Sequence, residues 1–130
     1  MDFHIRCEDL PEEVRRKEIQ AARQKPWNRG LPEGYTRYQL PDGSLGVFDT
    51  SATPNLGETF VGRLRLTPER ASDGRPGWTR RRLLARLSPG LYQIDIGTKW
   101  ERLIEWPDDD ICCIGVLVSV HEIAFFQRLS

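Results

Sequence analysis

The chain has 130 residues, of which 38% are hydrophobic and 29% are charged, a size and mix that predict one domain over residues 1–130. Nineteen Lys and Arg residues balance nineteen Asp and Glu residues, so no overall charge draws the protein to nucleic acid or an anionic membrane. The longest apolar run, residues 111–118, is far shorter than the roughly 20 residues that cross a bilayer. Residues 1–10 lack the features of a secretory signal. We therefore expect a cytoplasmic protein without a membrane partner.

The first two predicted elements are a strand and a helix. Residues 2–7 alternate between apolar and polar side chains, which is typical of a half-buried strand. Asp9 is a candidate N-cap, because Pro11 falls in the following turn and Glu12 stands three residues after the aspartate. These residues predict a helix over 11–24.

A β-hairpin is the clearest local pattern in the chain. Residues 35–40 and 45–50 flank the turn sequence Pro-Asp-Gly-Ser at 41–44, and these turn residues reverse an extended chain readily. Residues 59–67 then predict another strand, in which apolar side chains alternate with arginines.

The second half of the chain predicts a short helix and three strands. Residues 78–87 place their leucines on one side of a helical wheel, and Ser-Pro-Gly at 88–90 ends the predicted helix. Residues 91–96, 100–106 and 111–126 predict an antiparallel meander. The sum is an α+β domain, with a mostly antiparallel sheet of about six or seven strands and two helices. The last strand is either central or an edge that pairs with a second copy in a homodimer.

Neither the cysteines nor the acidic residues predict a metal or cofactor site. Cys7, Cys112 and Cys113 are an odd number without a C-x-x-C spacing, and neighbours on a strand point to opposite faces. We expect reduced, buried thiols. The aspartates at 108–110 lack calcium-loop spacing and predict a solvated turn.

Residues 63–102 form a basic block with ten basic and four acidic residues. Two readings stay open: phosphate contacts to nucleic acid, with Trp78 stacking on bases, or ion pairs with acidic residues of this chain or of a partner. The neutral net charge disfavours nucleic acid. The arginines concerned are Arg63, Arg65, Arg80, Arg81, Arg82 and Arg86.

The C-terminal third carries a family resemblance. Residues 90–97, the stretch 100–106, the acidic turn and the strand 111–126 resemble the C-terminal sheet of RelE/ParE-type toxins of bacterial toxin–antitoxin systems. The resemblance implies an endoribonuclease, in which the positions to carry over as RNA-contacting or catalytic residues are Lys99, Arg102 and His121. His121 alone also fits a histidine that meets water at a strand end.

The sequence contains no diagnostic catalytic motif, so a non-enzyme is the leading hypothesis. We expect a protein-binding module that neutralises or regulates a specific partner, like an immunity protein or an antitoxin, by complementary charge. Trp and Arg dominate binding hot spots, so the predicted contact residues are Trp27, Trp78, Arg81, Arg82 and Arg86. The alternatives are the RelE/ParE-type endoribonuclease and a nucleic-acid-binding domain that uses the basic block.

Overall fold

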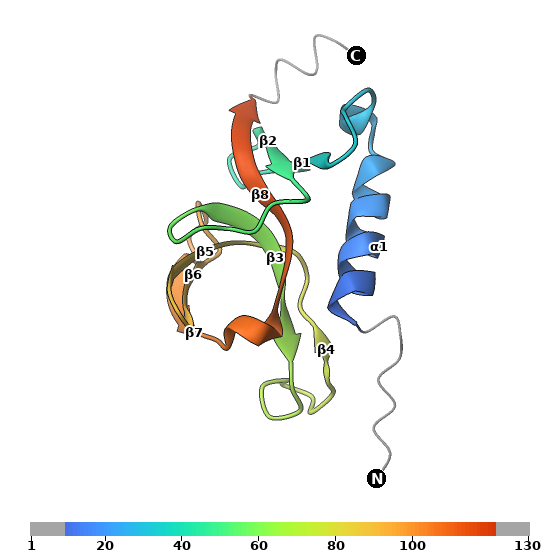
Figure 1. Cartoon of the computed structure of the whole chain (residues 1–130). Helices are drawn as coiled ribbons and strands as arrows, with labels where there is room; N and C mark the ends of the chain where they lie inside the picture. Colours follow the sequence, from blue (N-terminus) through green and yellow to red (C-terminus); the bar gives the residue numbers. More distant parts are fainter. Residues whose placement is uncertain (1–9, 122–130) are drawn as a thin grey trace.

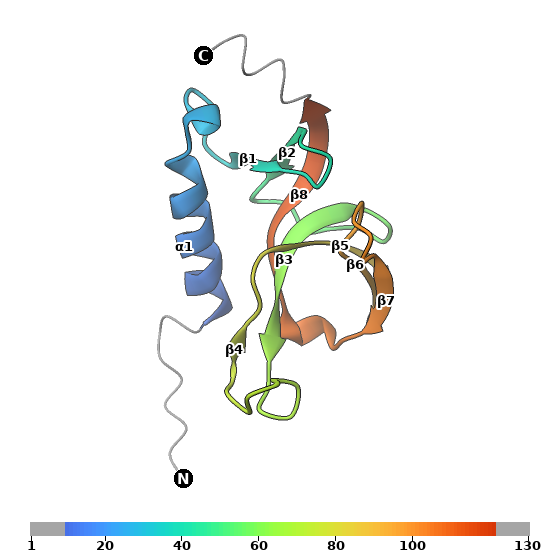
Figure 2. The same ribbon diagram turned by 180° about the vertical axis from the view of Figure 1, so that it is seen from behind.

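The computed structural model describes residues 10–121, with only the backbone described at His121. This part of the chain forms one α-helix and an antiparallel sheet of eight strands, and the helix lies along one face of the sheet (Figures 1 and 2). The α+β class is confirmed, with more strands and one α-helix fewer than predicted. The elements are α1 (Pro11–Arg23), η2 (Pro26–Asn28), β1 (Tyr35–Gln39), β2 (Leu45–Asp49), β3 (Thr59–Leu66), β4 (Gly77–Trp78), β5 (Arg82–Ser88), β6 (Leu91–Ile94), β7 (Arg102–Glu105), η3 (Asp108–Asp110) and β8 (Ile111–His121). The strand order is β1-β2-β8-β3-β5-β6-β7, and β4 pairs with β3 beside this path.

Helix α1 is present as predicted, but its N-cap position is Leu10 and not Asp9. A proline in the first turn has a fixed φ that suits a helix start and lacks an N–H that needs a cap. Asp9 and the strand predicted at residues 2–7 lie outside the described residues. The helix buries Val14 and Ala22 and packs against β1 and β8. In the described part of the chain, no helix is long and apolar enough to cross a bilayer.

The predicted hairpin is confirmed as β1 and β2, and the next predicted strand as β3. The turn is closed by the Leu40 N–H, which donates to the Ser44 carbonyl at 2.8 Å. Asp42 accepts a hydrogen bond from the Ser44 N–H at 2.9 Å, and Gly43 adopts a φ of 89°, which glycine does without strain. The turn chemistry therefore fixes the hairpin locally.

The second helix predicted over residues 78–87 is wrong, because this stretch forms β4 and β5. Leu84 packs in the core on one face of the sheet and Leu83 packs against the core on the other, an alternation that an extended chain gives. Residues 88–90 form the β5–β6 turn, where Gly90 has a φ of 77°. Pairing of β5 with β3 and β6 thus overrides the helical spacing of the leucines.

The predicted meander is right for β6 and β7 and wrong for β8. β6 and β7 are antiparallel neighbours, whereas β8 lies between β2 and β3. Ile114 packs in the core beneath α1 and Val116 in the core on the opposite face, so β8 needs cover on both sides, which a central position supplies. β7 is left at the edge of the sheet and pairs only with β6 among the described strands.

Two hydrophobic cores lie on opposite faces of the sheet. One fills the curl formed by β3, β5, β6 and β7 (Figure 1), and its buried residues are Phe60, Leu64, Leu84, Tyr92, Ile94 and Val116. The other lies beneath α1 and contains Ala22, Tyr38, Phe48, Val61 and Ile114. Cys112 and Cys113 are free thiols as predicted, but only Cys112 is buried and Cys113 is half-buried. Burial raises their pKa values to about 11 and about 12, so both stay protonated at neutral pH. Cys7 lies outside the described residues.

Candidate functional site

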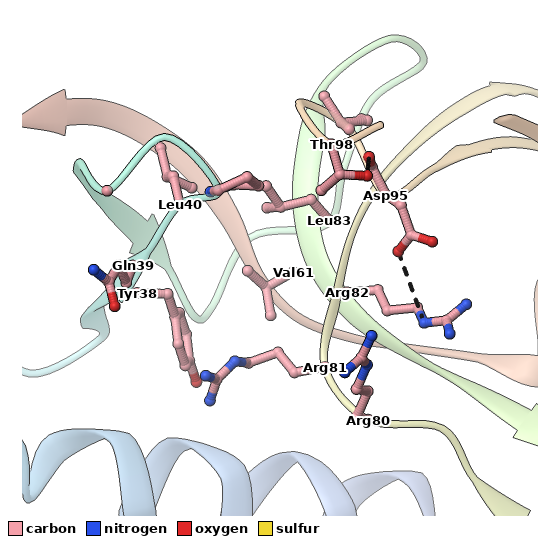
Figure 3. Close-up of a pocket in the computed structure, with 13 residues that line it drawn as sticks. Tyr38, Gln39, Leu40, Val61, Arg80, Arg81, Arg82, Leu83, Asp95 and Thr98 are labelled. Carbon is pink, nitrogen blue, oxygen red and sulfur yellow. Dashed lines mark hydrogen bonds and ion pairs between the residues drawn. The ribbon is translucent and has the colours of Figure 1, made fainter. Parts of the chain in front are cut away.

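A pocket of about 600 Å³ lies between the β1–β2 turn, the start of β5 and the loop after β6 (Figure 3). We call it the arginine pocket. Its charged and hydroxyl side chains are Tyr38, Arg80, Arg81, Arg82, Asp95 and Thr98. Its aliphatic side chains are Leu40, Pro41, Val61, Leu83 and Ile96. These residues come from segments far apart in the sequence, which the hairpin and the curl of the sheet bring together.

The three arginines reach the pocket because the chain that carries them runs between two fixed points. Before them, the Thr79 N–H donates to a carbonyl of β3 at 2.9 Å. At their end, Arg82 starts β5 opposite Gly62 of β3. Arg80 and Arg81 are exposed and Arg82 is half-buried, so all three guanidinium groups can meet a ligand that enters from solvent.

Arg81 is held between a carboxylate and an aromatic ring. Its guanidinium lies 3.4 Å from Oε2 of Glu18 and 4.5 Å from the centre of the Tyr38 ring. Glu18 also lies 3.8 Å from Arg63. Tyr38 is 3% exposed, and its hydroxyl has no hydrogen-bond partner among the described residues. Burial raises the pKa of that hydroxyl far above its usual range, so Tyr38 stays neutral.

Arg82 is only loosely paired. Its Nε lies 3.8 Å from Oδ1 of Asp95, too far for a hydrogen bond, and this Nε is buried without a hydrogen-bond partner in the described part of the chain. Asp95 is fixed by its backbone N–H, which donates to the Leu83 carbonyl at 2.9 Å. No ion pair forms between Arg80 and any described carboxylate. The pocket lining thus contains three arginines and one carboxylate, Asp95.

Further arginines of the basic block are neutralised inside the chain. Arg86 lies 2.8 Å from Asp108, and Arg70 lies 2.9 Å from Asp110. Ion pairs within the chain, one of the two readings of the basic block, therefore account for these arginines. The surface charge left for a nucleic-acid backbone is correspondingly reduced.

Of the five predicted contact residues, Arg81 and Arg82 lie in the arginine pocket and the other three lie elsewhere. Trp27 is half-buried in η2, with its indole nitrogen enclosed. Trp78 is half-buried in β4 and stacks with a β3 arginine whose guanidinium is 4.9 Å from its ring centre. Arg86 is engaged with the acidic turn. The structure therefore brings together only part of the predicted surface.

The acidic turn, now η3, ties the end of the sheet together. Asp108 accepts hydrogen bonds from the Tyr92 hydroxyl at 2.5 Å, from Arg86 at 2.8 Å and from the Gly90 N–H at 3.1 Å. These donors, the Tyr92 hydroxyl first, lower the pKa of Asp108 below its usual range. Within the described residues, no three metal-ligating side chains are gathered. The three hydrogen bonds to Asp108 link the turn to β5 and β6.

An apolar surface that the sequence reasoning missed lies at the edge strand β7. Trp100 is 65% exposed and Leu103 is 60% exposed, and we call the segment from residue 99 to residue 105 the β7 edge. The neighbour of Leu103, Ile104, packs against the core inside the curl of β3, β5, β6 and β7. Successive strand residues point to opposite faces, so Leu103 is an apolar residue on the solvent face. The alternation of faces along this strand could have predicted the exposed leucine from the sequence.

Lys99, Arg102 and His121, the residues implied by the toxin resemblance, do not form one site. Lys99 and Arg102 are exposed at the β7 edge, whereas His121 ends β8 and pairs with Leu45. Three strands separate β7 from β8 in the sheet. Comparisons with protein-family models, curated proteins and solved structures find no match for this chain.

Proposed function

We propose that this protein is a small protein-binding module that neutralises or regulates a specific partner, in the manner of an immunity protein or an antitoxin. The observation that carries the proposal is the β7 edge, where Trp100 and Leu103 expose 65% and 60% of their surface beside a strand edge that no other described strand covers. An unpaired edge offers backbone donors and acceptors to a further strand. Tryptophan is one of the residue types enriched in binding hot spots.

The partner we propose contributes an extended strand to β7. Its backbone would pair with that of β7, and an apolar side chain would cover Leu103. Lys99 and Arg102 alternate at this edge with Glu101 and Glu105, and all four are exposed, so the edge favours a partner strand that carries both acidic and basic residues. This is a contact between complementary surfaces that needs no catalytic group.

The two alternatives receive less support. A nucleic-acid interface depends on several cations that are free to contact phosphates, but the block contains five ion-paired arginines, and these are Arg63, Arg70, Arg81, Arg82 and Arg86. The endoribonuclease reading depends on Lys99, Arg102 and His121 acting together, and β7 and β8 are not neighbours.

The test is a charge placed on the β7 edge. The tagged full-length chain is purified from the cells that produce it, and a companion protein is expected at stoichiometric amount. Leu103→Glu should reduce recovery of that companion by at least about tenfold, because it puts a charge into the apolar centre of the contact. Companion recovery is measured by quantitative mass spectrometry.

The matched control is Leu56→Glu. Leu56 is also 60% exposed but lies in the loop before β3, and its substitution should leave recovery unchanged. Both variants should keep the thermal midpoint of the wild type. Equal loss in both variants, or full recovery with Leu103→Glu, would remove the β7 edge from the proposal. Growth arrest on expression that His121→Ala relieves would favour the endoribonuclease.

A further inference from the structure

We propose that the arginine pocket binds a small ligand that carries one oxyanion group, a phosphate or a carboxylate, on an apolar body. This proposal stands on the pocket and not on the β7 edge. Figure 3 shows guanidinium groups on one side of the pocket and the aliphatic side chains Leu40, Val61 and Leu83 on the other. A volume of about 600 Å³ is within the usual range of small-molecule sites.

The basic side of the pocket has donors that lack acceptors. Nε of Arg82 is buried and without a hydrogen bond within the described residues, although buried polar groups nearly always have a partner. Arg80 is exposed and joins none of the ion pairs of the described chain. Guanidinium groups bind phosphate and carboxylate in a fork of two parallel hydrogen bonds. The Arg82 Nε is closed to solvent, so a single oxyanion in the pocket would supply acceptors to Arg80 and to the terminal nitrogens of Arg82.

Tyr38 and Glu18 hold the guanidinium group of Arg81 in a fixed position at the pocket. The Tyr38 ring lies 4.5 Å from the Arg81 guanidinium, and its buried hydroxyl has no partner in the described part of the chain. Glu18 holds Arg81 from the helix side at 3.4 Å. Arg81 is therefore positioned before any ligand arrives, which lowers the entropy lost on binding.

The Asp95 carboxylate competes with the ligand for Arg82. Its carboxylate is 3.8 Å from Arg82, and it is the acidic member of the pocket lining. Its φ of 57° is in the left-handed region, which asparagine also adopts readily. Asp95→Asn thus removes the competing charge with little strain on the backbone.

The aliphatic side sets the second requirement on the ligand. Leu83 and Val61 project from β5 and β3, and Leu40 closes the pocket from the hairpin (Figure 3). Removing apolar surface from water is favourable in proportion to its area. An apolar body of the size of a phenyl ring would therefore add affinity that free inorganic phosphate does not gain.

The test is calorimetric titration of the full-length chain with phenyl phosphate, phenylacetate and, as the neutral probe, benzyl alcohol. The two anions are expected to bind and benzyl alcohol is not. Arg80→Gln should weaken binding by about tenfold, the value of one charge-assisted hydrogen bond. Arg75→Gln, an exposed arginine in the loop between β3 and β4, should leave the affinity unchanged.

Asp95→Asn is expected to tighten binding of the anions several-fold, because it frees Arg82. A variant with a damaged fold would bind the anions more weakly, so tighter binding cannot result from misfolding. Tighter binding of phenyl phosphate would identify a phosphate ligand, and tighter binding of phenylacetate a carboxylate. Absence of binding by both anions, equal binding of benzyl alcohol, or weaker binding by Asp95→Asn would overturn the proposal. Companion recovery with Arg80→Gln tests the β7 edge separately, since that variant leaves the edge intact.

Discussion

Gly62→Ala is expected to destabilise the fold by about 2 to 3 kcal/mol, the upper part of the range for overpacking a core. Gly62 lies in β3 where its register with β8 shifts. A Cβ there would lie 2.9 Å from the backbone carbonyl oxygen of Cys112 and 2.9 Å from Cδ1 of Leu84. β8 is held between β2 and β3, so its backbone cannot yield without loss of pairing.

Urea unfolding followed by tryptophan fluorescence measures this effect, with Gly77→Ala as the matched control. Gly77 is also a strand glycine, in β4, and a Cβ on it would meet nothing within 4 Å. The control should keep the midpoint of the wild type within a few tenths of a kcal/mol. If the two variants unfolded at the same urea concentration, the close approach of β8 to β3 would be wrong.

Local chemistry was sufficient to predict α1 and the β1–β2 hairpin. A proline at the helix start and a Pro-Asp-Gly-Ser turn act on neighbouring residues only, and both elements occur where their residues predicted them. The N-cap was predicted at Asp9 but lies at Leu10, because Pro11 takes the first helical position. The proline, and not the aspartate, indicated the correct start of the helix.

Non-local pairing decided the elements that sequence reasoning missed. The leucines of β5 have helical spacing, yet Leu83 and Leu84 are covered from opposite faces by two different cores. Likewise, β8 was expected beside β7 because the acidic turn joins them. Its apolar residues on both faces favour the centre of the sheet, and the gain from this burial outweighs the short connection.

The candidate site was predictable only in part for the same reason. Arg81 and Arg82 stand together in the sequence and were singled out by their charge. Asp95, Tyr38 and Leu40 share the pocket with them only after β1 and β6 have been placed in the sheet. Charge composition alone could not assign an ion-pair partner to each arginine. The ion pairs within the basic block could be assigned only once the fold was known.

Tyr92→Phe is expected to cost about 1 kcal/mol at pH 7, the value of a typical hydrogen bond, because the acceptor Asp108 is exposed to solvent. Tyr92 is 3% exposed, and its hydroxyl donates to Asp108 at 2.5 Å. Asp108 also accepts hydrogen bonds from Arg86 and from the β5–β6 turn at Gly90. Removal of the hydroxyl therefore weakens the link between η3 and the core that contains Tyr92. Thermal and urea unfolding measure the loss.

The same bond predicts how the loss depends on pH. The Tyr92 hydroxyl, the Gly90 N–H and Arg86 lower the pKa of Asp108. Their stabilisation is therefore fully present above the ordinary aspartate pKa of about 4 and disappears as the pH falls through the lower folded pKa. The difference between wild type and Tyr92→Phe should shrink over that window. The control Tyr35→Phe, at an exposed tyrosine, should have the stability of the wild type at every pH. If the stability deficit of Tyr92→Phe persisted in acid, Asp108 would not be the acceptor responsible for it.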